Sequence, residues 1–229
     1  MIADERSIGT LERALSLLDA FRTEDRALSL AEWSDRTGIN KATILRLAAN
    51  LERFGYLART AGGEFRIGPK PLQLGAQYQR WTQPSEIILP ALEKLVAETG
   101  ESASYMVRQS GVRMCVFRLN SPHSVRAQLR PGEVFPMDRG AAGKVILAFT
   151  KPHAAAFARI RRDGICVTHG EVTPDVAAIA APVFAGSGAI VGALSVSGPK
   201  YRFDRKAIDR ARGPLSEGAR FLSIALAED

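Results

Sequence analysis

Apolar residues in the first third of the chain recur every three or four positions, the spacing of one buried face of an α-helix. The pattern predicts helices from Thr10 to about Phe21, between Ser29 and Gly38, and between Asn40 and Gly55. The flanking residues agree, because Ser29-Leu-Ala-Glu32 has the spacing of a capping box. Gly38 and Asn40 are residue types that end and begin helices. The first third therefore reads as three short amphipathic helices.

The second and third predicted helices are separated by a few residues that include Gly38, which is the arrangement of a helix-turn-helix. After Gly55, residues 56–59 and 64–67 have strand composition and flank Ala61-Gly62-Gly63. Two short strands around a Gly-Gly turn predict a β-hairpin, or wing. We therefore expect a winged helix-turn-helix domain over residues 1–69.

From residue 101 onward the apolar spacing changes to the alternation of β-strands. We expect strands at residues 103–107, 112–117, 125–129, 179–184 and 189–196. Helices are expected at residues 85–100, at 141–150 and after Asp204, with a Gly213-Pro214 step inside the last one. Strands with helices on one side predict an α+β fold for residues 85–229.

Residues 70–84 connect the two predicted domains as a linker helix, and Pro71 suits its first turn. Its apolar residues are Leu72, Leu74, Tyr78 and Trp81. Such a surface pairs with the same helix of a second copy or packs against the chain's own C-terminal domain. The sequence leaves both arrangements open.

Charge is distributed unevenly along the 229 residues, which carry a net charge of +7. Hydrophobic residues make up 46% of the chain and charged residues 24%, which supports a packed core and excludes a mostly disordered chain. Residues 1–35 hold eight acidic and four basic residues, whereas residues 36–80 hold eight basic and two acidic ones. The most basic segment coincides with the helix-turn-helix, which is consistent with a polyanionic partner.

No motif of an enzyme or a metal site is present in the sequence. Residues 140–144 lack the G-x-x-x-x-G-K spacing of a phosphate-binding loop, and no G-x-S-x-G occurs. His123, His153 and His169 do not have the spacing of metal ligands. We therefore expect no catalytic activity, no metal and no cofactor.

The cysteines and the hydropathy of the chain indicate where in the cell the protein is located. Cys115 and Cys166 lie among apolar neighbours, so we expect unreactive core residues rather than a disulfide framework. No run of about 18 apolar residues is long enough to span a membrane, and the first ten residues lack the apolar core of a secretory signal. We expect a cytoplasmic protein that does not contact membranes.

The third predicted helix carries residues that suit DNA recognition on the face opposite its apolar positions. Arginine and asparagine read guanine and adenine edges, threonine contacts phosphate or methyl groups, and lysine and arginine in the wing suit backbone phosphates. A polar face that is merely solvated is the alternative. The expected DNA-binding residues are Lys41, Thr43, Arg46, Asn50, Arg53, Arg59 and Arg66.

Short runs along nearly the whole chain occur in a characteristic order. In the N-terminal part they are Leu28-Ser-Leu-Ala-Glu32, Thr37-Gly-Ile-Asn-Lys41, Gly55-Tyr-Leu57 and Phe65-Arg-Ile-Gly68. In the C-terminal part they are Gly143-Lys-Val-Ile-Leu147, Ile179-Ala-Ala-Pro-Val-Phe184 and Ala193-Leu-Ser-Val-Ser-Gly-Pro199. This series resembles the IclR family of bacterial transcriptional regulators, and the resemblance implies a GAF-like effector-binding domain at the C-terminus.

Two positions of the third helix depart from the pattern of that family. Ala42 stands where the family usually has serine, and Leu45 stands where it commonly has histidine or an aromatic residue. Ala42 cannot donate a hydroxyl to a phosphate. We expect Leu45 to turn from the groove face toward the core.

The local sequence and the resemblance together predict an effector site. Ser195 and Ser197 are two apart on a strand and face the same side, and Ala141 and Ala142 open a helix whose N-terminus favours an anion. The remaining positions follow from the resemblance, with Thr168 replacing an acidic residue sometimes found there. The expected effector-binding residues are Phe135, Ala141, Ala142, Thr168, Val176, Ala178, Ser195 and Ser197. The expected ligand is a small organic acid; the alternative is that the serines bond neighbouring backbone and the alanines pack tightly.

These features predict a ligand-responsive transcription regulator. Two copies would place their recognition helices in successive major grooves of a pseudo-palindromic operator, and the resemblance implies dimers that pair into tetramers. The alternative function is a small-molecule sensor whose winged domain binds a protein. A steep salt dependence of duplex binding distinguishes the two, because phosphate contacts release counterions.

Overall fold

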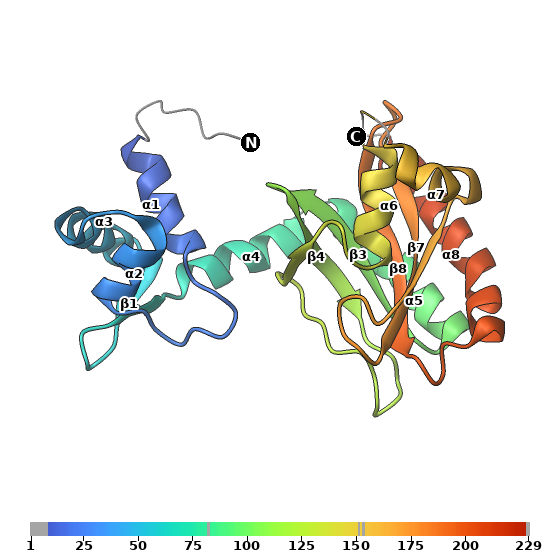
Figure 1. Cartoon of the computed structure of the whole chain (residues 1–229), viewed down its shortest axis with the longest axis horizontal. Coiled ribbons are helices and arrows are strands. Elements are labelled where there is room, and N and C mark those ends of the chain that lie inside the picture. Colours follow the sequence, from blue (N-terminus) through green and yellow to red (C-terminus); the bar gives the residue numbers. More distant parts are fainter. Residues whose placement is uncertain (1–8, 82, 151, 153, 228–229) are drawn as a thin grey trace. The chain divides into compact units, whose positions relative to one another are not determined.

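The computed structural model describes residues 9–81, 83–150, 152 and 154–227 (Figure 1). Residues 1–8 lie outside this description, and with them most of the segment that was expected to lack a secretory signal. His153 lies outside it as well. The chain divides into two compact units, residues 1–81 and 82–229. The predicted linker, residues 70–84, spans the junction between them. No helix within the described ranges combines the length and the apolarity needed to cross a membrane.

Three helices of the N-terminal unit form where local sequence signals predict them. They are α1 (Thr10–Asp19), α2 (Leu30–Thr37) and α3 (Lys41–Arg53). The Ser29 hydroxyl accepts a hydrogen bond from the Glu32 amide at 3.2 Å, and the Glu32 carboxylate accepts one from the Ser29 amide at 2.9 Å. Gly38 ends α2 with a φ of 69°, a left-handed conformation that glycine adopts without strain. The Asn40 side chain accepts a hydrogen bond from the Thr43 amide at 2.9 Å and so caps α3.

The wing follows α3 as an antiparallel pair, β1 (Leu57–Arg59) and β2 (Phe65–Ile67), and α4 (Lys70–Trp81) follows the wing. Phe65 is buried against Trp33, whose indole N–H donates to the Leu17 carbonyl at 2.8 Å. The core of this unit is therefore shared by all three helices and the wing. Its fully or nearly fully buried residues are Leu17, Leu28, Trp33, Ile44, Leu47, Ala48, Leu57 and Phe65.

Phe54 follows the last turn of α3 and is 62% exposed. One expectation for α3 is wrong. Leu45 does not turn toward the core and is 40% exposed, because Ile44, Leu47 and Ala48 already fill the buried face.

The C-terminal unit is built on a six-stranded antiparallel sheet in the order β5-β4-β3-β8-β7-β6. Its strands are β3 (Ser102–Gln109), β4 (Val112–Leu119), β5 (Val134–Pro136), β6 (Cys166–His169), β7 (Val176–Phe184) and β8 (Ile190–Pro199). Its helices are α5 (Gln83–Thr99), α6 (Ala141–Phe149), a short 3-10 turn at Ala155–Phe157, α7 (Ala158–Asp163) and α8 (Arg205–Ala225).

Helices cover both faces of this sheet, and not one face as the sequence suggested (Figure 1). Leu194 and Val196 of β8 pack with α5 and α8 in the larger core. Ala193, which alternates with them, packs with α6 in a second core on the opposite face. The sheet therefore separates a helical layer formed by α5 and α8 from a side that α6 covers.

Two further details of the C-terminal unit differ from the sequence expectation. Residues 125–129 form no strand and belong to the irregular segment 120–133 between β4 and β5. The short strands β5 and β6 have no counterpart in the prediction. By contrast, the helix expected after Asp204 is present as α8 and runs through Pro214.

Candidate functional site

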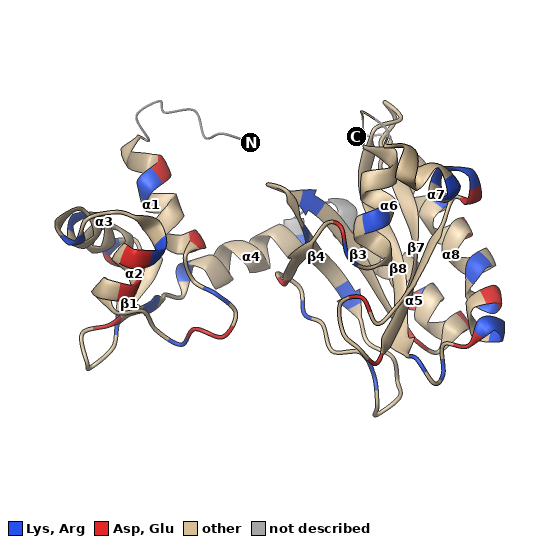
Figure 2. Cartoon of the chain, viewed as in Figure 1, with Lys and Arg blue, Asp and Glu red and all other residues tan. Residues whose placement is uncertain are grey.

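The outward face of α3 is polar and basic. Burial of Ile44, Leu47 and Ala48 leaves Lys41, Arg46, Asn50 and Arg53 exposed and Thr43 partly exposed. The Lys and Arg positions of α3 are blue in Figure 2. Arg59 and Arg66 of the wing are also exposed. All seven residues predicted to contact DNA are thus accessible on α3 and the wing.

The basic residues of this surface differ in their partners. Arg59 donates from Nε to both oxygens of Glu52, at 3.1 and 3.2 Å, and its guanidinium lies 4.4 Å from the centre of the Phe65 ring. Arg53 stacks over the exposed Phe54 ring at 4.9 Å. Within the described part of the chain, no carboxylate forms an ion pair with Lys41, Arg46, Arg53 or Arg66. Four positive charges per copy are therefore uncompensated.

An ion pair holds the segment before α2 against that helix. Arg36 on α2 contacts both carboxylate oxygens of Asp25, one of them at 3.1 Å, and donates to the Ala20 carbonyl at 3.0 Å. The hydrogen bond from Arg36 lowers the pKa of Asp25 to about 2. The contact ties the α1–α2 connection to the helix that precedes α3.

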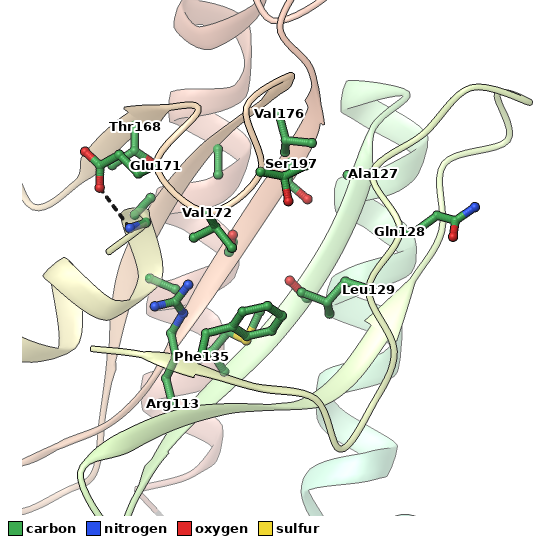
Figure 3. Close-up of a pocket in the computed structure, with 18 of the residues that line it drawn as sticks. Arg113, Ala127, Gln128, Leu129, Phe135, Thr168, Glu171, Val172, Val176 and Ser197 are labelled. Atoms are coloured by element: carbon green, nitrogen blue, oxygen red, sulfur yellow. Dashed lines mark hydrogen bonds between the residues drawn. The ribbon is translucent and has the colours of Figure 1, made fainter. Parts of the chain in front are cut away.

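A cavity of about 330 Å³ opens on the α6 side of the C-terminal sheet (Figure 3). This volume lies at the lower end of the range for small-molecule sites. All eight residues expected to contact an effector line it: Phe135, Ala141, Ala142, Thr168, Val176, Ala178, Ser195 and Ser197. The strands and α6 thus bring together positions that lie up to 62 residues apart in the chain.

Strand register explains why the hydroxyl groups meet in this cavity. Ser195 pairs with Ser104 on β3, and Ser197 pairs with Ala178 on β7, which in turn pairs with Thr168 on β6. Directly opposed residues of an antiparallel sheet project from the same face. Among the described residues, the hydroxyls of Ser104, Thr168, Ser195 and Ser197 make no hydrogen bond to another protein group. Bonding to neighbouring backbone, the alternative explanation for the serines, is therefore not what the structure contains.

The N-terminus of α6 is already engaged by a carboxylate that the sequence did not reveal. Glu171 accepts a hydrogen bond from the Gly140 amide at 2.9 Å and an ion-paired one from Lys144 Nζ. Partial burial raises the pKa of Glu171, but these two hydrogen bonds outweigh it and the net pKa is lowered. Glu171 therefore stands ionised on the cavity wall beside the first turn of α6.

Arg113 on β4 is the most buried charged group lining the cavity, with 4% of its surface exposed. Its Nη1 donates to the carbonyls of Pro136 and Arg139, and its guanidinium lies 5.2 Å from the Phe135 ring centre. Burial lowers the pKa of Arg113 to about 10, so the side chain is a cation at neutral pH. No local sequence pattern marks Arg113, because the pairing of β4 with β5 is what brings it to Phe135.

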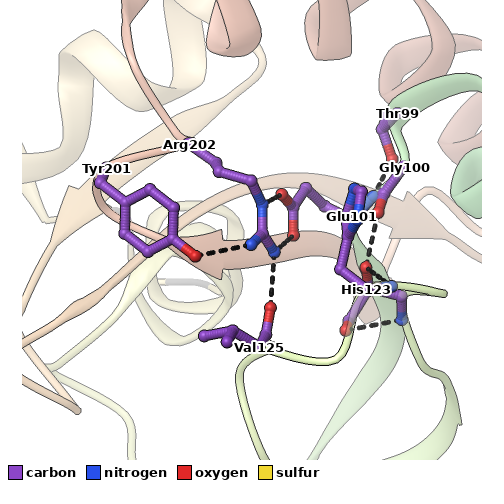
Figure 4. A network of polar contacts seen from close by, with 9 residues as sticks. Thr99, Gly100, Glu101, His123, Val125, Tyr201 and Arg202 are labelled. Carbon is purple, nitrogen blue, oxygen red and sulfur yellow. Dashed lines mark hydrogen bonds and ion pairs between the residues drawn. The ribbon is translucent and has the colours of Figure 1, made fainter.

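One wall of the cavity is the irregular segment 120–133, which contributes Ala127, Gln128 and Leu129. Arg202 anchors this segment, since it donates to the Val125 carbonyl at 2.8 Å and pairs with the buried Glu101 at 2.6 Å (Figure 4). On the other side, Arg118 donates to the Ala127 carbonyl. Side-chain contacts thus replace the strand pairing that the sequence suggested for residues 125–129.

Neither cysteine suits redox chemistry or metal binding. Cys115 and Cys166 are buried and free, and burial raises their pKa values to about 12 and about 11. Within the described residues, no group of three or more His, Cys, Asp or Glu side chains is placed to hold a metal ion.

Comparison with known proteins identifies both units. Residues 10–61 match the IclR helix-turn-helix domain, and residues 82–158 and 154–224 match the bacterial transcriptional regulator IclR C-terminal domain. The HTH-type transcriptional regulator BhcR of Paracoccus denitrificans is 25% identical, over 98% of this chain and 89% of its own length.

Solved structures have the same fold. A putative IclR transcriptional regulator from a Silicibacter species superposes with a TM-score of 0.85 at 23% identity, covering 96% of each chain. An IclR homologue from Microbacterium hydrocarbonoxydans, complexed with 4-hydroxybenzoate, has a TM-score of 0.76 at 19% identity and covers 96% of this chain and all of its own. These matches confirm the predicted α+β fold class, with a winged helix-turn-helix followed by a GAF-like domain.

The matched domains cover most of the chain, and the proteins that carry them are regulators rather than enzymes. The exposed basic recognition helix and the cavity in the C-terminal unit agree with that activity. The chain is a member of the IclR family of bacterial transcriptional regulators.

Proposed function

We propose that this regulator binds a pseudo-palindromic DNA operator in the cytoplasm. A small organic acid held in the C-terminal cavity changes its affinity for that operator. The proposal rests on two features that occur in one chain: a basic surface on α3 and the wing, and a mostly apolar cavity with a few polar groups in the second unit. DNA binding and effector binding follow from the family; the operator symmetry and the ligand class are inferred from the residues.

Base reading is assigned to the middle of α3. Arg46 and Asn50 are exposed one helical turn apart, and the Asn50 amide donates to the Arg46 carbonyl at 3.0 Å. Their side chains suit guanine and adenine edges in a major groove. Exposed Leu45 adds an apolar contact of the kind that thymine methyl groups accept. Lys41, together with the wing arginines, supplies contacts to the phosphates.

The ligand class follows from the chemistry of the cavity wall. The wall combines a buried cation, unpaired hydroxyls and apolar side chains with the first turn of α6, where Glu171 already takes the Gly140 amide. An organic acid with an apolar body satisfies all of these groups. The 4-hydroxybenzoate in the Microbacterium homologue supplies a first compound to screen.

Two copies are needed to read a pseudo-palindrome, and the family resemblance supports dimers or tetramers. Leu72, Leu74 and Tyr78 on α4 are exposed and offer apolar surface for such association; Trp81, expected to join them, has no described side chain.

Selection of bound fragments from a random double-stranded DNA pool tests the proposal. A recovered pseudo-palindrome supports it, and the spacing of the half-sites reports the geometry of the dimer. That operator then serves to screen organic acids for a change in affinity. Duplex binding that yields no consensus with or without the acids, and that is insensitive to salt, contradicts the proposal and favours a protein partner for the winged domain.

A further inference from the structure

Arg113 is a buried charge that has no ion-pair partner among the described residues. Among the described carboxylates, none forms an ion pair with it; Asp138 and Glu171 act on it only through longer-range Coulomb attraction. Glu171 is itself engaged by Lys144 and the Gly140 amide. Buried charges in proteins are normally paired, because an isolated ion loses its hydration on burial. The protein therefore leaves this cation to a partner from outside the chain.

The hydrogen-bonding pattern of Arg113 indicates where that partner lies. Nη1 is occupied by the carbonyls of Pro136 and Arg139. Nε is buried and has no acceptor among the described residues, and no hydrogen bond engages Nη2. Arg113 lines the cavity, and because Nε is fully buried, Nη2 beside Gly140 is the donor left for a ligand held there (Figure 3). The Phe135 ring lies beside the guanidinium on one side, and Gly140 at the start of α6 lies against it on another.

The hydroxyl groups lie at the other end of the same cavity. Ser197 pairs with Ser102 at the beginning of β3, whereas Arg113 pairs with Arg108 near the end of that strand. The side chains of Met106 and Leu129 contribute apolar lining to the same cavity. A ligand that satisfies both ends carries a carboxylate at one end and a hydroxyl or carbonyl at the other, joined by an apolar body.

We propose that Arg113 is the residue that selects the acid group of the effector, and that the effector's carboxylate completes an ion pair with its guanidinium. This inference rests on the proposed acid-sensing function. It goes further by naming the specificity-determining side chain and by requiring a second polar group opposite the carboxylate. The helix N-terminus alone cannot provide the selectivity, since Glu171 already lies beside it.

The chain contains a matched control on the same strand. Arg118 is also largely buried, also donates to a backbone carbonyl, and also has one nitrogen, Nη1, without an acceptor. It does not line the cavity itself, although its acceptor Ala127 does, so any loosening of that wall in Arg118→Gln weakens acid and amide alike and leaves their ratio unchanged. Arg113→Gln and Arg118→Gln each remove a largely buried arginine from β4. Only Arg113→Gln removes a charge that lines the cavity.

The experiment compares carboxylic acids with their neutral amides on the full-length protein. Isothermal titration calorimetry measures benzoate, 4-hydroxybenzoate, phenylacetate and 4-hydroxyphenylacetate, each against the corresponding primary amide. The wild type is expected to prefer the acid by roughly tenfold to a hundredfold, the range of a charge-assisted hydrogen bond. Arg113→Gln is expected to abolish that preference while amide affinity changes little. Arg118→Gln is expected to keep it.

A purely structural role for Arg113 would weaken acid and amide in proportion and leave their ratio unchanged. Arg113→Lys keeps the positive charge and a donor near the Pro136 carbonyl of β5, so it serves as a second variant in case Arg113→Gln does not fold. It is expected to retain part of the preference for the acid over the amide. An unchanged acid preference in folded Arg113→Gln overturns the assignment of Arg113 alone. Failure of every acid to bind the wild type at millimolar concentration overturns the inference together with the acid-sensing part of the proposed function.

Discussion

Replacement of one uncompensated arginine on α3 gives a quantitative test of the DNA-binding surface. The logarithm of the binding constant for duplex DNA falls linearly with the logarithm of salt concentration, with a slope of about −0.9 for each phosphate that the protein neutralises. Lys41, Arg53 and Arg66 have no acidic partner among the described residues, and Arg46 is assigned to a base edge. If each of these three neutralises one phosphate, a dimer has a slope of about −5.

Arg53→Gln removes one of these charges from each copy and is expected to make the slope shallower by about 1.8 in a dimer. Fluorescence anisotropy of a labelled duplex, titrated at several potassium chloride concentrations, measures both slopes. Arg205→Gln is the control, because it removes another exposed arginine, from α8 of the C-terminal unit. A slope that Arg53→Gln and Arg66→Gln both leave unchanged would refute the assignment of this surface to phosphates.

Three further predictions concern stability and the cavity. Trp33→Phe leaves the buried Leu17 carbonyl without its indole donor, and we expect urea unfolding followed by circular dichroism to show a loss of about 1–3 kcal/mol; an unchanged midpoint would contradict this. The pKa of Asp25 is about 2 in the folded protein against an ordinary value of 3.8, so its contribution to stability is present above pH 4 and is lost as the pH falls toward 2. Melting temperatures measured between pH 5 and pH 2 should therefore drop more in the wild type than in Asp25→Asn, and equal drops would argue against the ion pair. Combined Ser195→Ala and Ser197→Ala substitutions should weaken binding of a hydroxy acid several-fold in calorimetry, and unchanged affinity would count against these hydroxyls as ligand contacts.

The helix-turn-helix could be predicted from the sequence because its determinants are local. The capping box at Ser29 and Glu32, the left-handed Gly38 and the cap at Asn40 each act within four residues of the helix end that they define. Leu45 shows the limit of such reasoning. Its exposure is decided by how completely the neighbouring apolar residues fill the core, and that depends on the whole unit.

The cavity shows the same division between local and long-range information. The side to which Ser195 and Ser197 point follows from strand alternation, so it could be predicted. Arg113 and Glu171 were missed, because the first reaches the cavity through pairing of β4 with β5 and the second contacts Gly140 across 31 residues of sequence. Residues 125–129 look like a strand in isolation, yet side chains hold their carbonyls instead of a neighbouring strand.

The most direct test of the account is the affinity of the full-length protein for its selected operator, measured with and without an organic acid that calorimetry shows to bind. Coupling between two such sites is typically about 1–3 kcal/mol, which corresponds to a change in operator affinity of about 5-fold to 150-fold. The account predicts a shift of this size that Arg113→Gln removes. An acid that binds the cavity and leaves operator affinity unchanged would contradict it.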